Sequence, residues 1–415
     1  MNPETDSRYA WFRLWVSLAL ATIGGCGMYV VVVVLPVVQT EFGVARGGAS
    51  LPYMLTLIGF GIGGIVMGRI TDRFGVAVAA GVGALSLALG FVAAASANTL
   101  TAFAVFHGLL IGMLGSSATF SPLVADISFW FVRRRGIAVA ICASGNYLAG
   151  TVWPPIVEHF VGVAGWRQTY VGIGLFCLVT MLPLAMLLRR RTPSTLRAPV
   201  APAATSVRPQ GAPVTAFGVP PNTLLALLCV AGVACCVAMS MPQVHIVAYC
   251  GDLGYGAARG AQMLSLMFGF GIVSRLISGL ICDRIGGLRT LLLGSVLQGV
   301  ALLLFLPFDS LASLYVISAL FGLFQGGIVP SYAIIVREYF SPHDAAMRVG
   351  LVITATLFGM ALGGWMSGAI FDLTGSYDAA FINGIGWNLL NVTIVLWLIA
   401  RLRRRGHTLR PAAAH

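Results

Sequence analysis

The sequence predicts an all-α membrane protein with twelve transmembrane helices in two six-helix bundles and both termini in the cytoplasm. Three observations predict this fold class. The composition is 58% hydrophobic and only 9% charged, against about 25% charged residues in an ordinary soluble domain. About a dozen apolar runs reach the roughly 20 residues that a helix needs to cross a bilayer. One motif also occurs twice, about half a chain length apart.

The composition excludes several classes of protein. A chain this apolar needs lipid as its solvent, and its long unbroken runs lack the period-two alternation of barrel strands. All 25 basic residues are arginine, and the formal net charge is +12. The arginines lie at the ends of the apolar runs and in one connecting segment, not on a basic globular face. We therefore expect the lipid bilayer as a partner and no nucleic acid.

The expected spans follow one another along two halves of the chain. They lie near 14–38, 50–70, 76–96, 100–130, 137–160 and 166–188 in the first half, and near 222–250, 257–281, 288–307, 311–337, 347–371 and 379–402 in the second. The segment between the halves is rich in proline, alanine and threonine, which is typical of a flexible linker. The expected domains are an N-terminal bundle (1–188), a cytoplasmic linker (189–221), a C-terminal bundle (222–402) and a basic cytoplasmic tail (403–415).

The arginines predict the orientation of the chain. Twelve spans place both termini on one side of the membrane, and most arginines fall on that side, including the clusters at 133–135, 189–191 and 403–405. Because positively charged loops stay in the cytoplasm, the termini are expected there. The expected location is the cell inner membrane, as a multi-pass protein.

The repeated motif has the pattern Gly-x-x-x-Asp-Arg-x-Gly. Each residue of the second copy lies 211 positions after its counterpart, and both copies fall in expected cytoplasmic loops; they are Gly68, Asp72, Arg73, Gly75 and Gly279, Asp283, Arg284, Gly286. Duplicated halves in so apolar a chain are typical of secondary transporters.

With these motifs the sequence resembles the major facilitator superfamily over essentially its whole length. The match has one departure, because Val76 and Ala77 stand where a basic pair often follows the first copy. The resemblance implies two bundles that rock about a central site. It also implies that the Asp-Arg pairs latch the cytoplasmic ends of the bundles, with Asp126 as a partner of the first latch. The alternative is that these charges only anchor the topology. The expected gating residues are Asp72, Arg73, Asp283, Arg284, Asp126, Gly68 and Gly279.

A second duplicated pattern is a stripe of glycines. The second and eleventh spans carry it with identical spacing, as Gly59, Gly63, Gly64, Gly68 and as Gly359, Gly363, Gly364, Gly368. Glycines four apart form a groove that lets another backbone approach closely. Either these grooves form a sliding surface between the bundles, or they serve tight packing within one bundle.

Arg275 is the basic residue that lies well inside an expected span. It precedes Asp283 by eight residues, which places it about 12 Å from the inner boundary of the eighth span. Positions 271 and 279, one turn away on either side, are both glycine. A charge at this depth costs free energy unless it meets a partner, and a guanidinium matches a carboxylate. Arg275 is therefore the expected substrate anchor, with a structural ion pair or snorkelling as alternatives.

Here the resemblance narrows to the monocarboxylate transporters and their oxalate/formate antiporter relatives. It rests on Arg275-x-x-x-Gly279-x-x-x-Asp283, and on Phe131-x-Arg133-Arg134-x-Gly136 with Ala140. In that branch, an arginine at the position of Arg275 binds the substrate carboxylate. This chain has Gly271 where an aspartate is often found, and Phe120 where a tyrosine is expected. Anion binding therefore carries over, whereas the residues that this branch usually uses for proton coupling are not all present.

Further polar side chains inside the spans complete the expected site. His245 is the expected alternative proton carrier, because an imidazole titrates near neutral pH, or else a hydrogen-bonded core histidine. Amides and hydroxyls could bind a carboxylate or could link helices to one another. The expected substrate-binding residues are Arg275, Asn146, Tyr147, Phe120, Tyr332, Gln325 and His245.

The leading functional interpretation is a secondary active transporter of a small organic anion, most simply a monocarboxylate, that works by alternating access. Efflux of amphiphilic compounds is the first alternative, and a non-transporting membrane receptor is the second. An enzyme is not expected, because the sequence carries no catalytic constellation, metal pair, phosphate loop or cofactor motif. We expect a monomer without cofactor or metal, a small anionic substrate and a co-transported proton as a further partner. The coupling residue, and the choice between uptake and efflux, stay open.

Overall fold

The computed structural model describes residues 5–190, 216–340 and 342–408. Twelve helical segments within these residues are long and apolar enough to cross a membrane, which confirms the predicted all-α, twelve-span fold. The cytoplasmic position of both termini stays a prediction. The expected linker, 189–221, and the basic tail, 403–415, lie partly outside the described residues.

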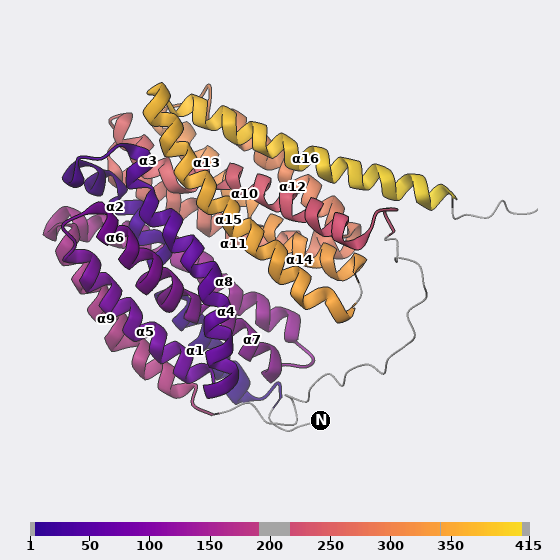
Figure 1. Cartoon of the computed structure of the whole chain (residues 1–415), viewed down its shortest axis with the longest axis horizontal. Helices are drawn as coiled ribbons and strands as arrows, with labels where there is room; N and C mark the ends of the chain where they lie inside the picture. The colour runs from indigo at the N-terminus through magenta and orange to yellow at the C-terminus, as the bar shows by residue number, and fades with distance from the viewer. Residues whose placement is uncertain (1–4, 191–215, 341, 409–415) are drawn as a thin grey trace, which may run out of the picture. The chain divides into compact units, whose positions relative to one another are not determined.

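The helices succeed one another along the first half of the chain as α1 (Arg8–Gly24), α2 (Cys26–Phe42), α3 (Arg46–Ala49), α4 (Leu51–Phe74), α5 (Val76–Ala95), α6 (Leu100–Phe106), α7 (Ser121–Trp130), α8 (Arg135–Ala164) and α9 (Trp166–Leu187). The second half contains α10 (Pro221–Asp252), α11 (Ala257–Ile285), α12 (Gly287–Leu304), α13 (Leu311–Gln325), α14 (Ile328–Tyr339), α15 (Pro342–Thr374) and α16 (Tyr377–Thr408). Figure 1 shows this order.

Local chemistry explains several helix ends. The side chains of Ser7, Thr99 and Ser310 each accept a hydrogen bond from the first turn of the helix that follows, as good N-cap residues do. The final glycine of each repeated motif takes a positive φ, 93° at Gly75 and 82° at Gly286. Glycine adopts this conformation without steric cost, so the chain turns into the next helix within one residue.

The chain forms two compact units that differ from a simple division at the linker. The first unit contains the described residues up to 190 together with His245–Gly269, and the second contains residues 216–244 and the described chain from Phe270 onward. The segment His245–Gly269 comprises the end of α10, a short turn and the first half of α11. We call it the α10–α11 hairpin, and its contacts below belong to the first unit.

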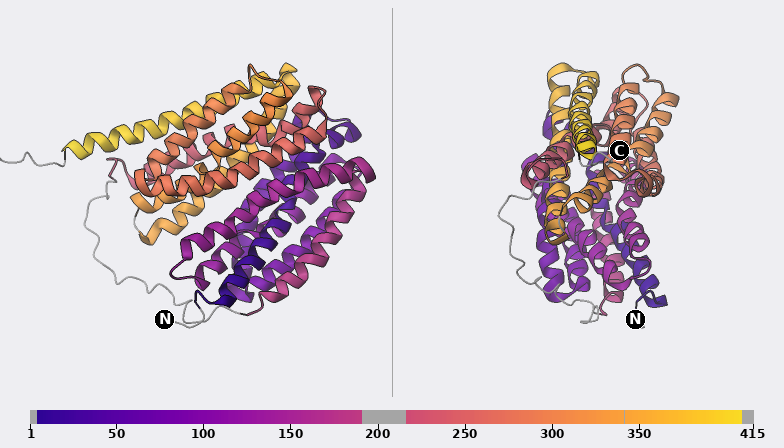
Figure 2. Two further views of the ribbon diagram at one scale, coloured as in Figure 1. Left: turned by 180° about the vertical axis from the view of Figure 1, so that it is seen from behind. Right: turned by 90° about the vertical axis from the view of Figure 1, so that its right-hand side faces the viewer.

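Each unit is a bundle of packed helices. In the first, α5 packs along α9, α4 along the middle of the fourth span, and α1 along α8. In the second, α12 contacts α13, α14 and α16, and α15 contacts α14 and α16. Figure 1 shows α5 beside α9 and the yellow helix α16 alongside α12, and Figure 2 shows the same helices from two further sides.

The fourth span departs from a regular helix at its centre. Between α6 and α7 the chain forms a π-helix, η1 (His107–Gly115), and then a 3₁₀ turn, η2 (Ser116–Thr119). His107, at the start of η1, is fully buried, and its Nε2 lies 3.1 Å from the hydroxyl of Tyr170. Its Nδ1 lies 3.4 Å from Oγ1 of Thr56. His107 is thus a hydrogen-bonded core residue that links three spans.

The glycine stripes pack inside the units. A Cβ at Gly59 or Gly63 would collide with the carbonyl oxygen of Gly108 or Met113 in η1. A Cβ at Gly359 or at Gly363 would lie 2.5 Å from a carbonyl oxygen of α10. These four glycines therefore allow two backbones of one unit to touch, as small residues commonly do between membrane helices. Of the two interpretations of the stripes, packing within a bundle accounts for these four.

Gly363 offers a direct test of this packing. Gly363→Ala should lower the thermal stability of the purified protein, because its methyl group would meet the Val237 backbone. Gly386→Ala in α16 is the matched control, since a Cβ there meets no atom of the described chain within 4 Å. The control should be neutral or stabilising by up to about 1 kcal/mol, the helix-propensity gain of alanine over glycine. Equal melting temperatures for the two variants in detergent would contradict the assigned contact.

Candidate functional site

Arg275 lies in the second half of α11 and belongs to the second unit. The residue is half-buried, and its Nε atom is shielded from solvent. It follows Phe268 by seven residues, about two helical turns, so both side chains project from one face of α11. Shielding part of a permanently charged guanidinium favours the binding of an anion beside it.

Gln325 is the last residue of α13 and is fully buried. Its Oε1 accepts a hydrogen bond from Nε2 of Gln243 on α10, at 2.8 Å. The next residue, Gly326, packs against Ser274 on α11, where an added Cβ would lie 2.8 Å from the Cβ of Ser274. Gln325 therefore lies beside the stretch of α11 that carries Arg275.

Tyr332 occupies a different environment within the second unit. It is fully buried, and its hydroxyl donates to Oδ1 of Asn391 at 3.0 Å. Nδ2 of Asn391 in turn donates to Oγ of Ser295 at 2.7 Å. The three residues link α14, α16 and α12, so the hydroxyl of Tyr332 serves as a link between helices in this structure.

Asn146 and Tyr147 lie on α8 in the first unit, near two aromatic residues that the sequence analysis did not select. The hydroxyl of Tyr29 on α2 donates to Oδ1 of Asn146 at 3.2 Å. The Phe268 ring packs edge-on against both tyrosines, with centroid distances of 4.7 Å to Tyr29 and 5.4 Å to Tyr147. Gly150 makes room for Phe268, because a Cβ there would lie 2.5 Å from the ring. We call Tyr29, Tyr147 and Phe268 the aromatic cluster.

Polar contacts also connect the α10–α11 hairpin to α3 and α8. The guanidinium of Arg46, on the short helix α3, forms an ion pair with both carboxylate oxygens of Asp252. Oγ of Ser265 donates to the backbone carbonyl of Thr151 on α8. The side chain of Arg46 is only 9% exposed, whereas that of Asp252 is 39% exposed, so the pair sits at the rim of the unit.

His245 and Phe120 are the two remaining expected site residues. His245 lies on α10, is the first residue of the α10–α11 hairpin, and is fully buried. Phe120 ends the η2 turn and packs against Phe60 of α4, with ring centroids 6.0 Å apart. Both belong to the first unit.

The repeated motifs lie at corresponding helix ends. Asp72 and Arg73 end α4, Asp283 and Arg284 end α11, and all four side chains are exposed. A Cβ at Gly68 or at Gly279 would contact no described atom within 4 Å. The motifs therefore present exposed charges and small residues, which suits contacts that break and form at low cost.

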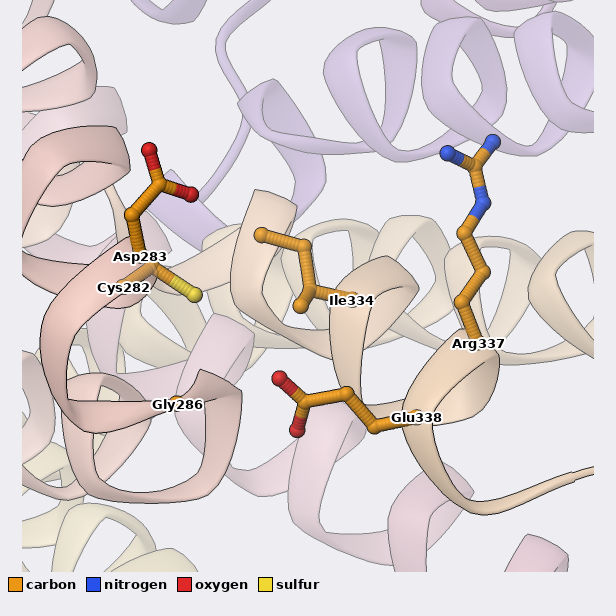
Figure 3. Close-up of a pocket in the computed structure, with 6 residues that line it drawn as sticks. All are labelled: Cys282, Asp283, Gly286, Ile334, Arg337 and Glu338. Atoms are coloured by element: carbon orange, nitrogen blue, oxygen red, sulfur yellow. The ribbon is translucent and has the colours of Figure 1, made fainter.

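Glu338 holds the second motif in place. The residue lies on α14, and its carboxylate accepts the backbone N–H of Gly287 at 3.1 and 3.3 Å. A carboxylate at this position satisfies a free N–H group and the positive end of the α12 dipole. Cys282, Asp283, Gly286, Ile334, Arg337 and Glu338 line an adjoining open pocket of about 500 Å³. Figure 3 shows the Glu338 carboxylate directed toward Gly286, whereas Asp283 and Arg337 extend away from it.

Asp126 forms an ion pair with Arg13, a partner that the sequence did not indicate. Its expected contact with the first motif stays a prediction. Nε and Nη2 of Arg13 donate to the two carboxylate oxygens of Asp126 at 2.7 and 3.0 Å, and the side chains are 1% and 5% exposed. Nη1 of Arg13 also donates to the carbonyls of Leu188 and Arg190. The predicted span began at residue 14, which left Arg13 at its edge. The helix begins earlier, at Arg8, so Arg13 is drawn into the unit.

Asp6 organises the arginine-rich corner after α7. Its Oδ2 accepts the backbone N–H groups of Val132 and Arg133 at 3.2 and 3.1 Å. Partial burial of the carboxyl raises its pKa, but these N–H donors lower it further, so the pKa of Asp6 lies below its ordinary value. The carboxylate is therefore charged at neutral pH and fixes the turn that leads into α8.

The sequence contained weak signals for the residues that the first interpretation left out. Asp252 ends an apolar run, and Gln243 is an amide inside one. Either residue could have been chosen as a candidate from its polarity, but the sequence could not show which residue it contacts. Arg46 is 206 residues from Asp252, and Gln325 is 82 residues from Gln243.

The family model described as Major Facilitator Superfamily matches residues 17–311 and 276–414. The chain belongs to the major facilitator superfamily. It is therefore a multi-pass membrane transporter and not an enzyme, as the sequence predicted.

Several known proteins are similar to this chain in sequence or in structure. Monocarboxylate transporter 13 of Rattus norvegicus is 28% identical over 311 residues, covering 72% of this chain and 68% of the relative. Agnestins efflux protein AgnL12 of Paecilomyces divaricatus is 23% identical over 338 residues, covering 81% and 74%. A bacterial homolog of the human lysosomal transporter Spinster, solved in an inward-facing and occupied conformation, has a TM-score of 0.65. It is 15% identical and covers 99% of this chain and 100% of its own, so it supports the fold alone.

The buried ion pair yields a stability prediction. Asp126→Asn should destabilise the protein by about 3–5 kcal/mol, because it leaves the Arg13 charge buried without its counter-charge. The double variant Arg13→Met/Asp126→Leu should recover most of that loss. Glu41→Gln is the control, because it breaks the ion pair of Glu41 with Arg167, in which both side chains are 37% exposed. This substitution should lower the stability much less. Apparent melting temperatures in detergent measure the loss of stability of each variant. A similar decrease for Glu41→Gln and Asp126→Asn would contradict the prediction.

Proposed function

We propose that this chain is a secondary active transporter of a small organic anion, a monocarboxylate, and that Arg275 binds its carboxylate. The observation that carries the proposal is the half-buried guanidinium within α11, whose Nε is shielded from solvent. A carboxylate can accept two parallel hydrogen bonds from such a group. The similarity to Monocarboxylate transporter 13 of two mammals, each 28% identical, supports the same class of substrate.

The proposed transport cycle uses alternating access. With the termini in the cytoplasm, as the arginines predict, the motif loops face inward and the α10–α11 hairpin faces outward. The Asp-Arg motifs act as inner latches, with Asp126 and Arg13 holding the helix ends beside the first motif. Those two residues line a cavity of about 280 Å³ together with residues 74–78 at the junction of α4 and α5. The ion pair of Arg46 with Asp252 and the aromatic cluster form the outer closure.

The remaining expected residues have supporting roles in the proposed cycle. Asn146 and Tyr147 place the aromatic cluster, and Gln325 lies beside the Arg275 stretch. His245 is the proposed site of a co-transported proton, because its imidazole is fully buried on α10 at the first residue of the hairpin. Phe120 borders the break in the fourth span. Tyr332 supports the fold around α14 through its bond to Asn391.

Replacement of Arg275 tests the substrate assignment. Arg275→Ala should abolish uptake of short monocarboxylates into proteoliposomes, because the compensating charge for the carboxylate is lost. Arg275→Lys should retain partial uptake, since it keeps the charge but not the planar fork. Arg259→Ala is the matched control on the same helix, because Arg259 is exposed and bonds only Gln262 among the described contacts. Normal uptake by a well-folded Arg275→Ala protein would exclude this anchor.

Cross-linking tests the outer closure. The double variant Arg46→Cys/Asp252→Cys, treated with a short bis-maleimide, should lose transport, because the hairpin can no longer leave α3. Each single cysteine variant, treated in the same way, is the control and should keep transport. The eight native cysteines should not interfere, since seven are buried and Cys229 is half-buried. Full transport by the cross-linked double variant would show that the hairpin does not open.

Efflux of amphiphilic compounds is the second candidate function, favoured by the similarity to an efflux protein of Paecilomyces divaricatus. In that case Arg275 would serve an internal ion pair and not the substrate. Overexpression in a drug-sensitive host separates the two functions. Resistance that is unchanged by Arg275→Ala would favour efflux over monocarboxylate transport.

A further inference from the structure

A pair of buried amides lies within the second unit. Nε2 of Gln243 donates to Oε1 of Gln325 at 2.8 Å, and the two residues are 4% and 0% exposed. Gln243 follows Pro242 within α10, and Gln325 ends α13 just before the Gly326–Gly327 break. The bond joins two helices of one unit.

Each amide keeps one polar atom without a partner. Oε1 of Gln243 and Nε2 of Gln325 are buried and form no hydrogen bond to any described residue, and the same holds for Oγ of Ser274. More than nine in ten buried polar groups in proteins are hydrogen-bonded, and an unsatisfied one costs free energy. The pattern does not depend on how the amides are oriented. Any single bond between two amides joins the nitrogen of one to the oxygen of the other. It therefore leaves the second nitrogen as a donor and the second oxygen as an acceptor.

The end of α13 that carries Gln325 packs against the stretch of α11 that carries Ser274 and Arg275. An added Cβ at Gly326, the residue after Gln325, would lie 2.8 Å from the Cβ of Ser274, and Gly326 also touches the carbonyl of Gly271. Ser274 immediately precedes Arg275 in the chain. The helix end that carries Gln325 and the helix segment that carries Arg275 are therefore neighbours within the second unit.

We propose that the Gln243–Gln325 pair is a recognition subsite for a hydroxyl group of the transported anion, which makes the substrate a hydroxy monocarboxylate. This inference rests on the proposed function, in which Arg275 binds the carboxylate. A hydroxyl matches the pair, because it donates to Oε1 of Gln243 and accepts from Nε2 of Gln325. A keto group accepts but cannot donate, and an alkyl group does neither. The expected preference is hydroxy acid, then keto acid, then unsubstituted acid.

Gln298 provides a matched comparison for a purely structural role. This buried glutamine of α12 is fully satisfied, since its Nε2 donates to the carbonyl of Cys235 at 3.2 Å and its Oε1 accepts from Sγ of Cys235. It links two helices of the same unit and leaves no amide atom without a partner. The Gln243–Gln325 pair differs from it only in the two atoms that remain available to a ligand.

The test measures uptake of 2-hydroxybutyrate, 2-oxobutyrate and butyrate into proteoliposomes. The native protein should favour 2-hydroxybutyrate over butyrate by roughly 10-fold to 100-fold, the usual penalty for leaving buried polar groups unpaired. Gln243→Leu/Gln325→Leu should bring this ratio close to one while butyrate uptake persists. We expect the double variant to fold, because replacing both partners by apolar groups of similar size is nearly neutral.

The outcomes separate the inference from the function on which it rests. Gln298→Leu, the control, should keep the native preference. The subsite is overturned if the native protein shows no preference for the hydroxy acid, or if the double variant keeps that preference. In either case, uptake that still depends on Arg275 leaves the proposed function intact. Loss of the hydroxyl preference in Gln298→Leu would also overturn the subsite, since disturbing any buried link between helices would then be enough to remove the preference. Absence of uptake for all three acids would overturn the proposed function and the subsite together.

Discussion

The structure depends on one constraint, the absence of water from the hydrocarbon core of the membrane. A backbone N–H or carbonyl group without a partner is costly there, so every span must be helical. The same constraint acts on side chains. Both ring nitrogens of His107 form hydrogen bonds, and the guanidinium of Arg13 donates to Asp126 and to two backbone carbonyls. Satisfied polar groups of this kind hold the helices of a unit in register.

This constraint also separates structural polar residues from binding residues. Tyr332 and Gln325 are equally buried, and both were candidates for the site from their chemistry alone. The hydroxyl of Tyr332 is bonded to a satisfied amide, whereas Gln325 and its partner Gln243 retain a free donor and acceptor among the described residues. An enclosed group that remains unsatisfied lowers stability unless a ligand completes it, so the pair suits binding better than support.

The two kinds of charged pair suit different roles in the proposed cycle. Arg13 and Asp126 are almost fully enclosed, and separating them would leave buried charges, so this pair fits a permanent link. The Asp-Arg pairs of the motifs are exposed, and the pair of Arg46 with Asp252 lies at a rim. Contacts of that kind break at low cost because water replaces the lost partner. The glycines of α4 and α15 bring backbones close and give each unit the rigidity that movement as a body requires.

By itself, the sequence determined the twelve spans, the duplicated halves and the superfamily. These features depend on local apolar length and on motifs, which are properties of neighbouring residues. Only the tertiary structure decided the partners: Asp126 pairs with Arg13, 113 residues away, and half of the glycine stripe packs inside its own unit. The sequence also could not show that the α10–α11 hairpin belongs to the first unit. Apolar helices have similar surfaces in lipid, so which residues meet depends on side-chain shape and hydrogen bonding between distant parts of the chain.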